Sequence, residues 1–192
     1  MTLKRIFIAV DYQPDSDFLY YFSFLRRQLR NEDITWSATQ NFHITLKFFG
    51  DTPEDHISSI IHQLDGITKK YESFQIQPNK LGIFGSLKQA RALWLSINES
   101  TGTLESLAQE IEHAFLTDPS KKNNSFTPHL TLGRPKFIRQ PDLLKNLMES
   151  SSQHVFNPFA IREVLLIWST LTPLGPQYKT LKSFPLQPLT LE

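Results

Sequence analysis

The sequence of 192 residues contains no cysteine. This absence excludes disulfide bonds and thiolate-ligated metal sites, and it is compatible with a reducing compartment. Long apolar runs are also missing, because no stretch approaches the roughly 20 apolar residues that a membrane-spanning helix needs. The apolar run at residues 6–10 is too short for the apolar region of a signal peptide, and no small-residue cleavage site follows it. We therefore expect a cytoplasmic protein without a membrane partner.

The net charge is also small, because the chain has 20 Lys and Arg and 19 Asp and Glu, which gives a formal charge of +1. A protein that coats long nucleic acids usually has a strongly basic face, whereas an enzyme for a short substrate needs only a local basic pocket. The 40% hydrophobic content, with 15 Phe and 3 Trp, is sufficient for a large aromatic-rich core. The length suits one domain, or two small lobes that share a core. We expect a monomer without an obligate protein partner.

Helical and strand patterns follow one another along the chain and predict an α+β fold. Apolar or alternating runs predict strands at residues 6–10, 34–36, 42–49, 73–81, 90–97, 128–133, 161–168 and 177–184. Helical spacing and capping residues predict helices at residues 15–30, 52–67, 104–116 and 141–148. The run 6–10 is expected to be buried on both faces, Gly50 and Asp51 are expected to stop the third strand, and Thr52 is expected to cap the second helix. Residues 121–125 form the most loop-like stretch.

A short motif occurs twice and indicates an internal duplication. Residues 42–46 read Phe-His-Ile-Thr-Leu, and residues 128–132 read Pro-His-Leu-Thr-Leu. Strand–helix–strand units occur in both halves, and no linker or low-complexity segment divides the chain. We therefore predict a single domain over residues 1–192, with one His-x-Thr-x motif in each related part.

Each motif lies in a predicted strand, where successive side chains point to opposite faces. His43 and Thr45 then share one face, as do His129 and Thr131, while the apolar residues between them anchor the strand in the core. A single His-x-Thr in a strand is weak evidence, because a half-buried His and a strand Thr are both ordinary. Two copies with matching apolar neighbours are much harder to attribute to chance.

Two imidazoles suit the hydrolysis of a phosphodiester without a metal ion. An imidazole has an ordinary pKa near 6.5, so that it can act as a base or as an acid at neutral pH. In an in-line displacement, one His would take a proton from water and the other would give a proton to the leaving oxygen. The hydroxyls of Thr45 and Thr131 could donate to the non-bridging phosphate oxygens. The residues alone do not say which His has which role.

Three residues near the motifs have weaker interpretations. Arg134 could bind a phosphate or stack on a base, or it could be an ordinary surface Arg. Phe48 could be a platform for a nucleobase, although core packing is the favoured interpretation. Lys47 shares the expected face of His43 and could add positive potential there. The other histidines have no repeated context: His56, His62, His113 and His154.

The paired motifs resemble the 2H phosphoesterase superfamily and, within it, the RNA 2′,3′-cyclic phosphodiesterases that were historically called 2′-5′ RNA ligases. The likeness covers residues 5–11, 41–50, 81–84, 91–95, 126–134 and 168–171, together with Tyr178. It includes an Arg after the second motif, Arg134. Gly133 stands where the family often has a bulkier apolar residue.

This resemblance implies a bilobal α+β fold, with two related lobes, an antiparallel sheet in each, helices packed outside and a central cleft between the sheets. It implies hydrolysis of a terminal RNA 2′,3′-cyclic phosphate to a 2′-phosphate, without a metal or another cofactor. His43 resembles the proton donor to the leaving 3′-oxygen, and His129 resembles the base that activates water. Thr45 and Thr131 resemble the residues that hold the phosphate. The expected partner is an RNA or oligonucleotide end, with Arg134 and Phe48 as further candidates for binding it.

Three alternatives remain at this point. The same acid–base pair could join 2′,3′-cyclic and 5′-hydroxyl RNA ends by the reverse reaction, whereas an ATP-dependent ligase is disfavoured because its phosphate loop and adenylation motif are missing. The chain could instead be a nucleotide-binding module without turnover. A metallohydrolase is disfavoured, since neither motif has an adjacent Asp or Glu and no His-Glu-x-x-His occurs.

Overall fold

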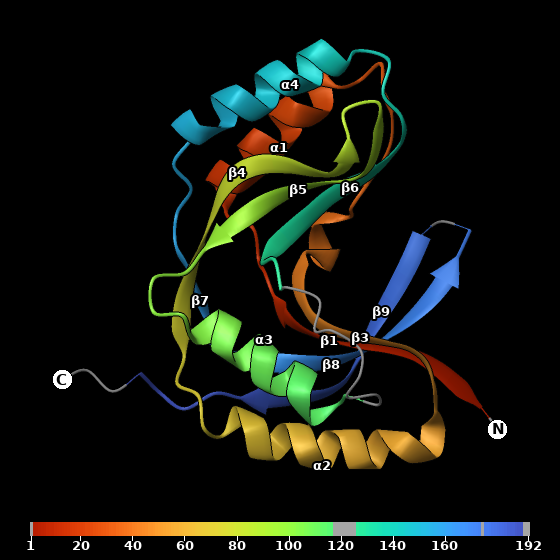
Figure 1. Ribbon diagram of the computed structural model, residues 1–192, viewed down its shortest axis with the longest axis vertical. Coiled ribbons are helices and arrows are strands. Elements are labelled where there is room, and N and C mark those ends of the chain that lie inside the picture. Colours follow the sequence, from red (N-terminus) through yellow and green to blue (C-terminus); the bar gives the residue numbers. More distant parts are fainter. Residues whose placement is uncertain (1, 117–125, 174, 190–192) are drawn as a thin grey trace.

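Two antiparallel sheets organise the computed structural model, which describes residues 2–116, 126–173 and 175–189 (Figure 1). The first sheet has the order β3-β1-β8-β9, with β1 (Leu3–Asp11), β3 (His43–Pro53), β8 (Glu163–Thr172) and β9 (Gly175–Pro185). The second sheet has the order β2-β6-β5-β4-β7, with β2 (Asp33–Trp36), β4 (Phe74–Ser86), β5 (Gln89–Asn98), β6 (His129–Phe137) and β7 (Phe159–Ile161). The predicted loop at residues 121–125 lies outside the described residues.

Two helices accompany each sheet. Figure 1 shows α1 (Ser16–Gln28) and α4 (Pro141–Ser150) together beside β4, β5 and β6, at one end of the molecule. At the other end, α2 (Ile57–Thr68) and α3 (Thr103–Ala114) pack against each other and contact strands of the first sheet. Short 3₁₀ turns complete the described elements: η1 (Thr39–Asn41), η2 (Glu54–His56) and η3 (Ser151–Gln153). The predicted bilobal α+β fold is confirmed, with one His-x-Thr-x motif on each sheet.

The central strand β1 is buried on both faces, as its continuous apolar run predicted. Ile6, Ile8 and Val10 pack into the main core under the helices. Phe7 and Ala9 point to the opposite face, where they form a second cluster with residues of β8. Burying a side chain of this kind contributes roughly 1.5–3 kcal/mol, so β1 is a rigid support for the strands on either side of it.

The boundaries of β3 and α2 differ from the prediction. β3 continues through Gly50 to Pro53 instead of stopping, because Gly50 adopts a φ of +76° within a bulge and so bends the strand without ending it. Thr52 and Pro53 are therefore strand residues, and Thr52 does not cap the helix. By contrast, α1 begins close to the predicted residue 15, where Asp15 caps it, since its carboxylate accepts from the backbone N–H of Phe18 at 2.8 Å.

The predicted strand at residues 161–168 is two strands in the structure. β7 ends at Ile161 and pairs with β4 in the second sheet, whereas β8 begins at Glu163 and pairs with β1 in the first. The chain thus passes from one sheet to the other at Arg162. Two exposed charged residues, Arg162 and Glu163, interrupt the apolar sequence at this point, but such a pair does not by itself distinguish a change of sheet from one continuous strand.

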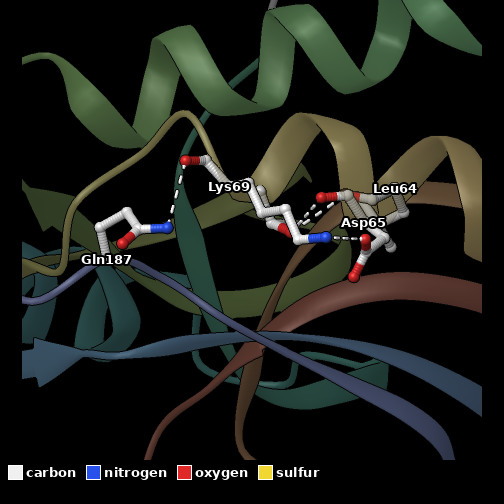
Figure 2. Close-up of polar contacts among 5 residues, drawn as sticks. Leu64, Asp65, Lys69 and Gln187 are labelled. Carbon is white, nitrogen blue, oxygen red and sulfur yellow. Dashed lines mark hydrogen bonds and ion pairs between the residues drawn. The ribbon is translucent and has the colours of Figure 1, made fainter.

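The polypeptide that follows β9 fastens the connection between the two lobes. Gln187 donates to the carbonyl oxygen of Lys69 at 3.4 Å, at the end of α2, and Lys69 forms an ion pair with Asp65 one turn earlier (Figure 2). The backbone of Gln187 also accepts from Ser73 and donates to Tyr71. The segment between α2 and β4, which leads into the second sheet, is therefore hydrogen-bonded to the chain that follows β9 of the first sheet. None of the helices within the described ranges is long and apolar enough to cross a bilayer.

Candidate active site

His43 and His129 are the first residues of β3 and β6, on different sheets. The two strands approach each other, with Cα atoms within 8 Å. The short connection after β2 brings them together. The backbone N–H of Ser37 donates a hydrogen bond to the carbonyl oxygen of Leu132 in β6, and its hydroxyl donates to the carbonyl oxygen of Thr131. His43 follows Ser37 by only six positions. The two motifs, which are far apart in sequence, are thereby brought together.

A β-bulge occurs at the same place in both motifs. In β3, Thr45 pairs with Ala9 of β1, but the next position of β1, Ile8, pairs with Lys47. In β6, Thr131 pairs with Trp94 of β5, but the next position of β5, Leu93, pairs with Gly133. Each strand therefore has one extra residue immediately after its Thr. A bulge reverses the alternation of faces and redirects the side chains beyond it.

The bulge exchanges the expected positions of Lys47 and Phe48. Lys47 was predicted on the face of His43, but it points to the helices and forms an ion pair with Glu112 of α3 at 2.7 Å. Phe48 pairs with Phe7 and lies on that face, with 50% of its surface exposed, so the interpretation as a core residue is wrong. The guanidinium of Arg5 lies over the Phe48 ring, 4.6 Å from its centre.

Arg134 occupies the position in β6 that corresponds to Phe48 in β3. It is exposed, and after burial, which is the main cause, its positive charge helps to lower the pKa of His43 and His129. The pKa of Tyr178 is raised by burial, and the charge of Arg134 opposes that shift. The unusual Gly133 before it has a structural reason. A Cβ there would lie 2.9 Å from Ile34 Cγ2 and 3.1 Å from the backbone oxygen of Thr35, so only glycine lets β2 pair this closely.

Both imidazoles are held in the same way. Nδ1 of His43 lies 2.7 Å from the carbonyl oxygen of Asn41, and Nδ1 of His129 lies 2.7 Å from the carbonyl oxygen of Thr127. A carbonyl can only accept, so Nδ1 carries a proton in each ring. Nε2 is then the atom that can accept a proton in the neutral ring or donate one in the charged ring. Each His is therefore held in one tautomer, with Nε2 available for proton transfer.

Two aromatic side chains flank His43. The ring centre of Phe7 lies 4.9 Å from that of His43, and the ring of Tyr178 in β9 meets it edge-on at 5.3 Å. The side chain of Asn41 donates to the carbonyl oxygen of Pro176 at 3.2 Å, which holds the start of β9 against the segment before His43. Side chains of β1 and β9 thus cover part of the His43 imidazole.

His129 has an equivalent aromatic pair from the second sheet. Phe84 in β4 meets its ring edge-on at 4.8 Å, and Trp94 in β5 lies at 6.1 Å. The indole nitrogen of Trp94 is buried and has no hydrogen-bond partner among the described residues. The ring of Trp94 also lies under Gly82, where an added Cβ would meet it at 2.4 Å. The rings of Phe84 and Trp94 therefore pack against the imidazole of His129 on one face of β6.

Burial is the main influence on both imidazoles, and it lowers the pKa of each below the ordinary value. For His43, the bond to Asn41 and the negative charge of Asp11 oppose this effect, while His129 and Arg134 add to it. For His129, the bond to Thr127 opposes it and Arg134 adds to it. Because such interactions weaken with distance, the influence of Arg134 on both rings indicates that the two rings lie near the same guanidinium.

Sequence reasoning missed Asp11, the cross-strand neighbour of His43. It lies 32 positions earlier in the chain, so only the register between β1 and β3 brings it to the motif. Phe7, Phe84 and Trp94 were also not singled out for contact with an imidazole, although all three lie in segments of the family resemblance. Their alternation in apolar strands could have placed them on a face, but not next to a particular histidine.

Thr45 and Thr131 occupy half-buried strand positions two residues after the two histidines. Neither side chain hydroxyl has a hydrogen-bond partner among the described residues, so each can donate to a bound group. Among the described residues, no three His, Cys, Asp or Glu side chains lie close enough together to hold a metal ion. Of the other histidines, His154 contacts Asp17 at 3.1 Å and packs on Tyr21, away from both motifs.

Comparison with known proteins gives a consistent result. The chain is 33% identical over 151 residues to the RNA 2′,3′-cyclic phosphodiesterase of Aquifex aeolicus, covering 78% of this chain and 80% of the relative. It is 30% identical to the RNA 2′,3′-cyclic phosphodiesterase of Methanothermobacter thermautotrophicus, with 95% and 98% covered. The crystal structure of TT0787 of Thermus thermophilus has the same fold, with a TM-score of 0.73 over 96% of this chain and 98% of that one at 20% identity. The model of the 2′-5′ RNA ligase superfamily matches residues 25–170, and the chain belongs to this family.

Proposed function

We propose that this protein hydrolyses the 2′,3′-cyclic phosphate at an RNA end to a 2′-phosphate, with His43 as proton donor, His129 as proton acceptor and no metal ion. The observation that carries the proposal is the matched build of the two motifs. Each presents an Nε2 on an imidazole fixed through Nδ1, and the charge of His129 is among the influences that lower the pKa of His43, after burial as the main cause. The names of the relatives at 33% and 30% identity support the same substrate class.

The reaction needs one proton accepted and one donated. Neutral His129 takes a proton from water through Nε2 as the water oxygen forms a bond to phosphorus. The bond between phosphorus and the 3′-oxygen breaks, and charged His43 gives its Nε2 proton to that oxygen. The products are a 2′-phosphomonoester and a free 3′-hydroxyl. Exchange of protons with solvent then restores both rings.

The charges around the two rings support this division of roles. Asp11 favours the charged form of His43, as a proton donor requires. Within the described residues no carboxylate acts in this way on His129, where burial and Arg134 favour the neutral form that a base requires. The cyclic phosphate is an anion, so its binding beside Arg134 would offset the guanidinium charge and allow His43 to hold its proton.

The remaining candidates supply contacts to the substrate. Thr45 and Thr131 would donate to the non-bridging oxygens as negative charge develops on them, and Arg134 would provide a charge-assisted bond. Phe48, exposed on the face of His43, would stack on the terminal base with its ring kept in position by Arg5. These are the same residues that the sequence singled out, with Arg5 added by the structure.

A product assay tests the proposal. A short RNA that ends in a 2′,3′-cyclic phosphate is incubated with the protein and EDTA, and the product isomer is identified by chromatography against 2′- and 3′-phosphate standards. We expect the 2′-phosphate at an undiminished rate. A 3′-phosphate product, or loss of turnover that added metal restores, would contradict the mechanism. Excess 5′-hydroxyl RNA in a parallel reaction detects the reverse, joining reaction.

A further inference from the structure

A basic groove lies beyond the motif of β6 and has no part in the proposed chemistry. It has a volume of about 650 Å³ and lies between the turn that joins β4 to β5 and the last residues of β6. Lys88 and Arg91 line one side, and Lys136 and Phe137 line the other, with Pro135 between them and the motif. We refer to this feature as the β6 groove.

The charge of the groove is unbalanced. None of the described residues that line it is acidic, although the chain as a whole has nearly equal numbers of acidic and basic residues. Lys88 and Arg91 form no ion pair with the described residues, and Lys136 has only a long contact of 3.9 Å with Asp33. Three exposed cations with so little compensation produce a local positive potential that attracts an anionic partner.

Phe137 adds an aromatic surface to these cations. Its side chain is 57% exposed, and it makes no ring contact with another described aromatic residue. A cationic groove combined with an exposed ring is the arrangement that binds single-stranded nucleic acid, in which phosphates meet the cations and a base stacks on the ring. An acidic peptide would use the cations but would have no need for the ring.

The position of the groove on β6 connects it with the candidate active site. The same strand carries His129, Thr131, Arg134 and then Lys136, and the extended backbone from His129 to Lys136 spans about 23 Å. A single nucleotide bound at the histidines is too short to reach the groove. An RNA of several nucleotides can place its cyclic end at the histidines while its preceding phosphates follow β6.

We propose that the β6 groove binds the single-stranded RNA chain upstream of the cyclic phosphate, so that the enzyme prefers oligonucleotide ends to cyclic mononucleotides. This inference rests on the proposed function for its substrate, but the binding of RNA in the groove can be measured separately from turnover. It assigns Lys88, Arg91 and Lys136 to phosphates and Phe137 to a base.

The test compares two variants of equal charge. One carries Lys88→Gln, Arg91→Gln and Lys136→Gln. The control carries Lys80→Gln, Arg162→Gln and Lys182→Gln, which are exposed residues outside the groove. kcat/KM is measured with a cyclic mononucleotide and with an RNA of about eight nucleotides that ends in a cyclic phosphate.

For the groove variant we expect kcat/KM to fall about tenfold with the RNA and to be unchanged with the mononucleotide, while the control variant resembles the wild type. The negative slope of log kcat/KM against log salt should also become shallower by about 2, since each lost phosphate contact on a single strand removes about 0.7 from its magnitude. Equal loss in both triple variants, or no loss in the groove variant, would overturn the inference.

Fluorescence anisotropy with the same RNA carrying an uncleavable 3′-phosphate distinguishes this inference from the proposed function. If the wild type binds the RNA more tightly than the groove variant does, the groove is supported even where no turnover of either substrate is found. If polyglutamate displaces the RNA as effectively as unlabelled RNA at equal charge, the groove is a general anion site and the inference is wrong. Phe137→Ser should weaken RNA binding with no change in the salt slope, because stacking releases no counterions.

Discussion

The two motif strands, β3 and β6, are built alike but surrounded differently. Both begin with a His held through Nδ1 by the carbonyl two residues earlier, and both have a bulge directly after the Thr. The residues that follow differ: β3 has Lys47 and Phe48, whereas β6 has Gly133 and Arg134. The shared features fix the imidazoles, and the differing features decide the charge around them.

This comparison indicates how a duplicated strand can acquire two roles. A carboxylate, Asp11, acts on His43 alone, because β1 pairs with β3 and brings it there. Three residues after the motif Thr, β6 has the guanidinium of Arg134 where β3 has the ring of Phe48. The internal duplication stays a prediction, and the matching bulges are a further likeness between the two motif strands. The division into acid and base would then arise from the neighbouring strands and not from the motif itself.

The largest expected effect comes from removing either imidazole. His43→Ala and His129→Ala should each lower kcat/KM for the cyclic phosphate by roughly 100-fold or more, since each removes one proton-transfer step. An aryl phosphodiester with a nitrophenolate leaving group distinguishes the roles, because that group departs without a proton. We expect His43→Ala to lose much less activity with the aryl substrate than with RNA, and His129→Ala to lose similar activity with both. The opposite pattern would exchange the two assignments.

The next comparison uses the residues after each bulge. Arg134→Gln should lower kcat/KM by roughly 10- to 100-fold, which corresponds to a charge-assisted bond of about 1.5–3 kcal/mol. Phe48→Leu keeps an apolar surface but no ring, and it should mainly raise KM by a few-fold because stacking holds the base in both ground and transition states. Steady-state kinetics with an RNA end measure both variants. A larger loss for Phe48→Leu than for Arg134→Gln would show that the base, not the phosphate, dominates binding.

The sequence predicted those features that depend only on residues close to one another in the chain. The spacing of two residues is sufficient to place His43 with Thr45 and His129 with Thr131, because alternation is a local property of an extended chain. The apolar run of β1 likewise predicted burial on both faces. Family resemblance added the bilobal arrangement, which no local pattern contains.

Features that depend on pairing between distant strands could not be predicted in this way. The bulge after Thr45 is defined by the register with Ile8 and Ala9, so the exchange of Lys47 and Phe48 was not visible in the sequence. The proximity of Asp11 to His43 has the same origin. Gly133 looked like a departure from the family, and its reason lies in the approach of β2.

A stability comparison tests that reason for Gly133. Gly133→Ala should reduce the free energy of unfolding by about 1–3 kcal/mol, because the added methyl forces β2 away from β6. At the equivalent position of β3, Lys47→Ala removes a partly exposed ion pair and should cost about 0.2–1 kcal/mol. Urea denaturation measures both. Gly66→Ala, in the last turn of α2, is the control, because an added Cβ there would meet no atom of another segment within 4 Å, and it should stabilise by about 0.5–1 kcal/mol. Equal stability of Gly133→Ala and wild type would mean that β2 does not need the glycine.

The smallest effect, and the one that most directly tests the difference between the two motifs, is expected from Asp11→Asn. The wild-type profile of kcat/KM against pH should be bell-shaped with its maximum below pH 6.5, because the pKa of both imidazoles is lowered from that value. Asp11 raises the pKa of His43, so its removal lowers this pKa further. If His43 donates the proton, fewer molecules retain it at high pH, and kcat/KM falls on the alkaline side while the acid side is unchanged.

If His43 were the base, the same lowered pKa would leave more of it neutral at low pH. kcat/KM would then rise on the acid side, with the alkaline side unchanged. The side of the profile that moves therefore identifies the role of His43, whichever of the two imidazoles has the higher pKa. Asp51→Asn, at an exposed position of β3 whose charge does not act on His43, is the matched control and should leave both sides in place. If Asp11→Asn changed neither the acid side nor the alkaline side of the profile, the neighbouring carboxylate would not distinguish the two motifs.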